Sequence, residues 1–127
     1  MHMPTYANTL PPLSLSPGDV GFSFNAEAVP SSATAGSQFA VPHPTGIPDQ
    51  SHTVRWQTLF VTGPTAINVS LQGAMFDVAA EYKDIDVSTN AAGEARTVTG
   101  VQANFLRISV NSSTVGSGSG FTAKFMV

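Results

Sequence analysis

Histidines and closely spaced carboxylates are the residues of this chain whose types and spacing could support catalysis or metal binding. His43 and His52 lie with Asp49 in the proline-rich stretch "VPHPTGIPDQSHT". Zinc ligands are usually found at fixed helical or strand spacings, and this stretch shows neither spacing. We therefore expect solvated loop residues here and no metal site.

A second pair of candidate residues consists of two aspartates separated by one position. Asp84 and Asp86 should lie on the same face of a strand, because side chains alternate along a strand. Two carboxylates can hydrolyse a glycoside when they face each other across a cleft, and together with Glu94 they could bind calcium. Since carboxylates on an exposed strand face are normally solvated, we expect neither chemistry.

The sequence lacks the common nucleophile and phosphate-binding motifs. It contains no cysteine, which excludes disulfides, thiolate zinc sites and cysteine nucleophiles. It contains no G-x-S-x-G elbow, and the "GSGSG" of residues 116–120 fits no phosphate-binding loop. Trp56, the only tryptophan, should be a core residue, with a sugar-stacking surface as the alternative. We predict that the protein is not an enzyme and needs no cofactor.

Charge is scarce, and this limits the classes of partner. Only 10% of the 127 residues are charged, with 5 Lys and Arg against 8 Asp and Glu. Nucleic-acid binding requires clustered positive charge, which these scattered cations do not provide. No apolar run approaches the roughly 20 residues that span a bilayer, and the first residues do not resemble a secretory signal. We expect no nucleic-acid or membrane partner, and a neutral polar surface suited to packing against proteins.

The elements that must position these residues are strands. Apolar and polar residues alternate in residues 19–29, 53–61, 66–72, 84–88, 105–110 and 121–127, and further strands are expected at 39–42 and 95–101. Short alternating segments separated by Gly, Pro and Asn indicate antiparallel strands with one buried face. We predict an all-β fold, an antiparallel β-sandwich that is jelly-roll-like.

The alternation also predicts which side chains share a face. We expect Arg107 and Ser109 to face solvent. The sets expected to share one face are Val20, Phe22 and Phe24; Val54, Trp56, Thr58 and Phe60; Ile67, Val69 and Leu71; Leu106, Ile108 and Val110; and Phe121, Ala123, Phe125 and Val127.

Two segments between these strands call for separate predictions. The stretch "GAMFDVAAEYKD" of residues 73–84 has apolar residues at helical spacing. We expect a loop that leads into a strand at Glu81, with a short helix as the alternative. The stretch "SSTVGSGSG" of residues 112–120 should be a hairpin loop, because its glycines accept positive φ angles.

The start of the chain differs from the rest. Residues 1–18 form an apolar, proline-bearing arm, and residues 19–127 form the sandwich domain. The arm is too apolar for an ordinary disordered tail. It either lies along its own domain or reaches onto a neighbouring chain. The residues that would make such a contact are Tyr6, Leu10, Pro11, Pro12, Leu13 and Leu15.

The order of motifs in residues 53–127 resembles a small β-sandwich of tailed-bacteriophage virions. A strand that ends in a Gly-Pro turn is followed by a V-x-L-x-G strand, a strand with an aspartate and an FLR strand. The matching residues are Gly63, Pro64, Val69, Leu71, Gly73, Asp86, Phe105, Leu106 and Arg107. Such domains often have S-L-D-G and an aromatic residue after the second strand, where this chain has "AMFD" at residues 74–77. This difference argues against a sugar-binding loop there.

The resemblance implies a head decoration (cement) protein. Such a protein binds the major capsid protein between capsomers, and it stabilises the shell because it binds the assembled form more tightly than the free subunits. The implied protein is a homo-oligomer, a dimer or a trimer, made in the host bacterial cytoplasm and located on the capsid surface of the virion. The alternative is a carbohydrate- or receptor-binding module of a phage tail.

Overall fold

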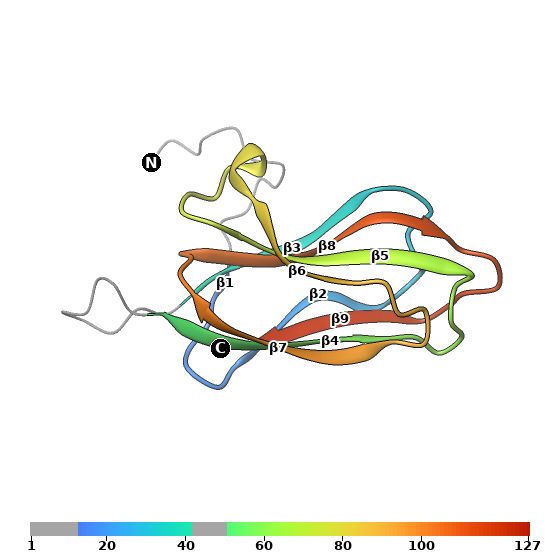
Figure 1. The fold of residues 1–127 in the computed structure, drawn as a ribbon, viewed down its shortest axis with the longest axis horizontal. Helices are drawn as coiled ribbons and strands as arrows, with labels where there is room; N and C mark the ends of the chain where they lie inside the picture. Colours follow the sequence, from blue (N-terminus) through green and yellow to red (C-terminus); the bar gives the residue numbers. More distant parts are fainter. Residues whose placement is uncertain (1–12, 42–50) are drawn as a thin grey trace.

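The computed structural model describes residues 13–41 and 51–127. In these residues two sheets pack face to face and form a β-sandwich, as predicted (Figure 1). One sheet has five strands in the order β1-β3-β8-β5-β6, and the other has four in the order β2-β9-β4-β7. The elements are β1 (Leu13–Ser14), β2 (Val20–Glu27), β3 (Thr34–Ala40), β4 (His52–Leu59), β5 (Ala66–Ala74), the 3-10 turn η1 (Ala79–Glu81), β6 (Lys83–Ser88), β7 (Glu94–Val101), β8 (Phe105–Thr114) and β9 (Phe121–Met126).

Strands β2 to β9 follow the path of a jelly roll. The chain passes to the opposite sheet at every connection between them except that from β5 to β6, which are neighbours in one sheet. The short strand β1 adds to the edge of the five-stranded sheet, parallel to β3. The prediction of a jelly-roll-like sandwich is therefore confirmed.

The predicted hairpin at residues 112–120 is wrong. β8 pairs with β3 and β5, whereas β9 pairs with β2 and β4 in the other sheet. Both edges of each strand are already paired within its own sheet, so β8 and β9 cannot pair with each other. The glycine-containing segment between them is an arch that joins the two sheets.

The core lies between the sheets and consists of alternate residues of the central strands. The predicted inward faces of β4, β5, β8 and β9 are confirmed, and Thr58 is buried with them while Phe60 and Val127 pack at the margin of the core. Ser109 was predicted to face solvent, but it is buried. Its hydroxyl group donates a hydrogen bond to the carbonyl oxygen of Thr34 at 3.2 Å, which satisfies the buried polar group. The apolar residues that are at most 5% exposed include Val54, Trp56, Ile67, Val69, Leu71, Leu106, Ile108, Val110, Phe121, Ala123 and Phe125.

A bulge in β2 changes the predicted face of that strand. The pairing of β2 with β9 shifts register between Phe22 and Phe24. A bulge adds one residue to a strand, which reverses the inward and outward positions beyond it. Phe24 is therefore buried, while Val20 and Phe22 are 44% and 39% exposed on the outer face. The prediction that the three residues share one face is wrong.

A second bulge separates the two aspartates. In the pairing of β5 with β6, Leu71 lies opposite Asp86 and Gln72 lies opposite Asp84, so Ile85 is the extra residue. Asp84 accepts a hydrogen bond from Gln72 Nε2 at 2.9 Å, whereas Asp86 faces the opposite sheet and accepts one from the indole of Trp56 at 2.9 Å. The two carboxylates do not share an exposed face, contrary to the prediction.

The segment with helical spacing is mostly a loop, as expected. β5 continues to Ala74, and a single 3-10 turn, η1, precedes β6, which begins at Lys83 and not at Glu81. The strand expected at residues 39–42 is present as β3, but it already begins at Thr34.

Candidate functional site

The predicted arm can be followed only from residue 13 onward. Leu13 and Ser14 pair with β3, and the amide of Leu15 donates a hydrogen bond to the carbonyl oxygen of Ala40 at 3.0 Å. Leu15 is 8% exposed and belongs to the core of its own domain, whereas Leu13 is 72% exposed. In these residues the segment lies along its own domain, and Leu13 is its exposed large apolar side chain. The other predicted contact residues lie outside the described residues; they are Tyr6, Leu10, Pro11 and Pro12.

Leu13 lies at the same end of the five-stranded sheet as the loop after β5. Ser14 pairs with Ala40 on β3, and Ala40 pairs with Phe105 on β8. Phe105 in turn pairs with Ala74, the last residue of β5. Met75 and Phe76 follow directly and are 65% and 63% exposed. We call Leu13, Met75 and Phe76 the apolar end. Exposed large apolar side chains that gather at one end of a sheet can form a binding surface, whereas such side chains scattered singly are normal.

A buried polar cluster holds this loop against the outer face of the sheet. The hydroxyl group of Tyr82 donates a hydrogen bond to Asp77 at 2.8 Å, and the guanidinium of Arg107 lies 4.1 Å from the centre of the Tyr82 ring. Arg107 Nε also donates to Gln72 at 2.8 Å. Burial lowers the pKa of Arg107, while Tyr82 and Asp77 act in the opposite direction. The cluster fixes the loop that carries the exposed residues of the apolar end.

An ion-pair network joins the edge strands of the two sheets. Arg96 on β7 binds Asp86 on β6 through Nε at 2.7 Å and Nη2 at 3.0 Å, and it binds Glu94 through Nη1 at 3.1 Å. The hydrogen bonds from Arg96 hold the pKa of Asp86 below its ordinary value against the opposing effect of burial, and the indole of Trp56 adds to them. The hydroxyl group of Ser88, which donates to Glu94 at 2.7 Å, is the main cause of the lowered pKa of Glu94. The network is a structural link between the sheets.

This network also decides two of the alternatives raised by the sequence. Trp56 is 2% exposed and its one polar atom is bonded to Asp86, so it is a core residue and not a sugar-stacking surface. Asp86 and Glu94 are both engaged by Arg96, while Asp84 turns away toward Gln72. The three carboxylates considered for calcium binding do not converge.

The described residues hold neither a group of metal ligands nor a helix that could span a membrane. Within residues 13–41 and 51–127, no three His, Cys, Asp or Glu side chains are grouped so that they could hold a metal ion. His52 begins β4, while His43 and Asp49 lie outside the described residues. The described part of the chain also has no helix of the length and apolar character needed to cross a membrane. That the protein needs no metal and is not an enzyme stays a prediction.

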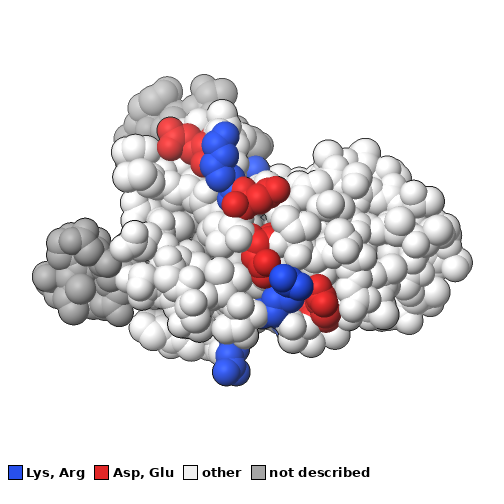
Figure 2. All heavy atoms as spheres, viewed as in Figure 1, with Lys and Arg blue, Asp and Glu red and all other residues white. Residues whose placement is uncertain are grey.

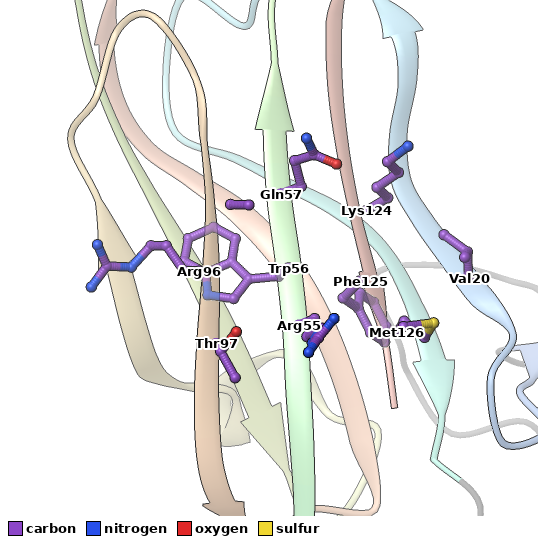
Figure 3. A pocket seen from close by; sticks show the side chains of 10 residues that line it. Val20, Arg55, Trp56, Gln57, Arg96, Thr97, Lys124, Phe125 and Met126 are labelled. Atoms are coloured by element: carbon purple, nitrogen blue, oxygen red, sulfur yellow. The ribbon is translucent and has the colours of Figure 1, made fainter.

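A hollow of about 350 Å³ lies on the outer face of the four-stranded sheet, and we call it the sheet groove (Figure 3). Trp56 and Phe125 point into the core, so their neighbours along β4 and β9 point outward into the groove. All four strands contribute side chains to it. They are Val20 from β2, Arg55 and Gln57 from β4, Ala95 and Thr97 from β7, and Lys124 and Met126 from β9.

The exposed charge of the sheet groove is positive. Arg55 and Lys124 are exposed or half-buried, and no Asp or Glu is among the described residues that line the groove. Lys124 Nζ lies 5.7 Å from the centre of the Phe22 ring at the margin of the groove. Arg96 also borders the groove, but its guanidinium is engaged by Asp86 and Glu94, and the remaining lining side chains are neutral polar or apolar. This combination can hold a small anion-bearing ligand that also has an apolar surface.

Sequence reasoning did not find the sheet groove. The signal in the sequence was only that the polar faces of two predicted strands carry Arg55, Gln57 and Lys124. It did not show that these residues lie together. Their proximity depends on the pairing of β4 with β9, in which Gln57 lies opposite Lys124. Pairing between strands so distant in the chain cannot be read from alternation.

No family model, curated protein or solved structure matches this chain. Its function must therefore be inferred from its own fold and surfaces.

Proposed function

We propose that this protein is a structural virion protein that decorates and stabilises a bacteriophage capsid. It binds the major capsid protein between capsomers as a dimer or trimer, and it reaches the capsid surface after synthesis in the bacterial cytoplasm. The observation that carries the proposal is the apolar end, where Leu13, Met75 and Phe76 are 72%, 65% and 63% exposed. Side chains of this kind lose unfavourable contact with water when a partner protein covers them.

The distribution of charge supports the same role. Most charged side chains on the face drawn in Figure 2 form one band of both signs, one cation lies apart at the lower edge, and large areas of the described surface in that view are uncharged. Three of the charged residues, Asp86, Glu94 and Arg96, are already paired with one another, since Arg96 engages both carboxylates. The centres of protein interfaces are depleted of charged residues, because desolvating a charge is costly. A surface with large uncharged areas therefore suits attachment to another protein.

The jelly roll and the motif resemblance support the choice of a capsid protein as the partner. Jelly rolls are found in viral capsid proteins, although also in lectins. Residues 53–127, which carry the resemblance, include six of the nine strands, β4 to β9, and most of the core, while Leu13 and the arm precede them. Tight binding to the assembled shell would stabilise it by mass action, by about 2.7 kcal/mol for each site at a hundredfold excess over Kd.

The test is co-sedimentation of the full chain with undecorated capsid shells. We expect the double variant Met75→Ser, Phe76→Ser to lose about tenfold or more in affinity, or at least 1.4 kcal/mol. Val61→Ser is the matched control, because Val61 is 84% exposed and lies near the Thr114 end of β8, opposite the apolar end. Full-length protein that binds no shell, or a double variant that binds as tightly as the control, would contradict the proposal.

The arm is tested by a separate deletion. Removal of residues 1–12 should weaken shell binding or reduce the oligomer mass in light scattering, while the sandwich remains folded. The deletion stops before β1 because Leu15 is part of the core, so that a longer deletion would create a cavity. If the shortened chain keeps both its affinity for shells and its oligomer mass, residues 1–12 contribute to neither shell binding nor oligomer formation.

A second candidate function is supported by the sheet groove. It is a carbohydrate- or receptor-binding module of a phage tail, because concave sites with a few polar groups on an apolar surface bind small ligands. The groove of about 350 Å³ has this character. Binding to a glycan by a protein that binds no shell would favour this function over the first.

A further inference from the structure

We propose that the sheet groove binds an acidic saccharide, whose carboxylate lies between Arg55 and Lys124. This inference rests on the second candidate function and names its ligand class. It does not depend on shell binding, which was assigned to the apolar end.

The two cations of the groove lie close together on one sheet face. Arg55 is paired with Met126 and Gln57 with Lys124, so Arg55 and Lys124 are diagonal neighbours on β4 and β9. Diagonal positions of this kind are about 7–8 Å apart, with their Cβ atoms somewhat closer, which is within reach of long side chains. Two like charges at this spacing repel each other. An anion between them would remove the repulsion and interact with both.

No described residue supplies that anion. The lining of the groove contains no Asp or Glu, and the salt bridges of the described residues involve Arg96 and not Arg55 or Lys124. Arg107, by contrast, is stacked on Tyr82 and bonded to Gln72. The chain has 5 cations and 8 acidic residues, yet none of the described carboxylates pairs with these two adjacent cations. We take this to indicate that a ligand supplies the carboxylate. The planar guanidinium of arginine is suited to hold a carboxylate with two parallel hydrogen bonds.

The other lining side chains match the rest of a sugar. Thr97 lies opposite Arg55 on β7 and Gln57 lies two residues further along β4, so they offer a hydroxyl and an amide group to which sugar hydroxyl groups can bond (Figure 3). Val20 and Met126 provide apolar contact for the C–H face of a sugar ring. The volume of about 350 Å³ is at the lower end of the usual range for small-ligand sites.

The position of the groove favours a saccharide over an acidic peptide. β9 pairs with β2 and β4 on its two sides, and β4 pairs with β9 and β7. The backbone donors and acceptors of β4 and β9, the two strands that carry Arg55 and Lys124, are therefore used within the sheet. An extended peptide is recognised mainly through backbone hydrogen bonds at a sheet edge, and the middle of a sheet offers none. A saccharide can be held by side chains alone.

The test is an NMR titration of the full-length, isotope-labelled protein with two acidic saccharides, 3′-sialyllactose and trigalacturonate. Their uncharged counterparts are lactose and fully methyl-esterified trigalacturonate. We expect at least one acidic probe to shift the amide signals of residues 55–57 and 124–126 saturably, and its counterpart to bind about tenfold or more weakly. Arg55→Gln and Lys124→Gln should each weaken binding by a similar factor. Lys83→Gln, which removes an exposed cation outside the groove, should leave it unchanged.

The outcomes separate this inference from the function on which it rests. If the neutral sugars bind as well as the acidic ones, the protein is still a carbohydrate-binding module, but the role of the two cations is wrong. If neither acidic saccharide shifts the groove signals while a glutamate-rich peptide does, the ligand is a protein segment and the inference fails. If nothing binds the groove, both the inference and the second candidate function fail. Binding that is the same in the Arg55→Gln and Lys124→Gln variants would also overturn the inference.

Discussion

Ser23 completes the hydrogen bonding of a sheet to which it does not belong, and replacing it with alanine tests this arrangement. The pairing of β3 with β8 shifts register between Ala35 and Gln38. At this shift the amide of Ile108 donates a hydrogen bond to Ser23 Oγ at 2.9 Å, and Ser23 Oγ donates to the carbonyl oxygen of Ser37 at 2.9 Å. Ser23 is on β2 in the opposite sheet and is 3% exposed. One hydroxyl group therefore bridges the two strands across the bulge.

The expected effect follows from what the substitution leaves behind. In Ser23→Ala the buried amide of Ile108 loses its acceptor, and an unsatisfied buried polar group costs about 1–3 kcal/mol. The Ser37 carbonyl loses a donor as well, so we expect unfolding free energy to fall by about 2–3 kcal/mol. A chain of 127 residues has an unfolding entropy near 0.27 kcal/mol/K, so the melting temperature should fall by about 8–11 °C.

Urea denaturation and thermal melting measure this change, and hydrogen exchange localises it. Ser37→Ala is the matched control, because the Ser37 side chain is exposed and its carbonyl is unchanged by the substitution. We expect the control to stay within about 0.5 kcal/mol of the original protein. The amide of Ile108 should exchange faster in Ser23→Ala only. Equal destabilisation by the two variants, or unchanged exchange at Ile108, would refute the bridging role of Ser23.

Three further predictions concern the core, the β3 bulge and the link between the sheets. Ile108→Ala should cost about 2–5 kcal/mol, because Ile108 is 0% exposed; an unchanged urea midpoint would contradict its place in the core. Gly36→Ala should cost about 1–3 kcal/mol, because its Cβ would lie 2.5 Å from the Ile108 carbonyl oxygen and 2.6 Å from Ser23 Cβ; unaltered thermal melting would argue against this close approach. Asp86→Asn should cost about 1–2 kcal/mol at neutral pH, since it weakens charged hydrogen bonds. Because the folded protein lowers the pKa of Asp86, its contribution is complete above the unfolded pKa of about 4 and is lost as the pH falls through the folded value. The stability difference between the two proteins should therefore shrink in acid, and a difference that stays constant on acid titration would be evidence against the ion pair.

The sequence by itself determined the fold class and most of the core. Alternation in β4, β5, β8 and β9 predicted their inward faces, because each of these strands is regular over the residues concerned. Successive side chains of a regular strand point to opposite faces of the sheet, whichever strand it pairs with. The alternation in Leu106, Ile108 and Val110 is the clearest case, since all three are at most 1% exposed.

Only the tertiary structure decided the bulges, the strand order and the sheet groove. The bulges in β2 and β6 depend on the register with a partner strand, so the sequence of one strand does not show where Phe22 turns outward or where Asp86 turns toward Trp56. The sequence of the arch between β8 and β9 is typical of a hairpin loop. A hairpin is excluded because each of the two strands is already paired on both sides within its own sheet. Arg55 and Lys124 become neighbours because β9 is inserted between β2 and β4. Such contacts form between strands far apart in the chain, and they are set by how the whole core packs and not by any local pattern.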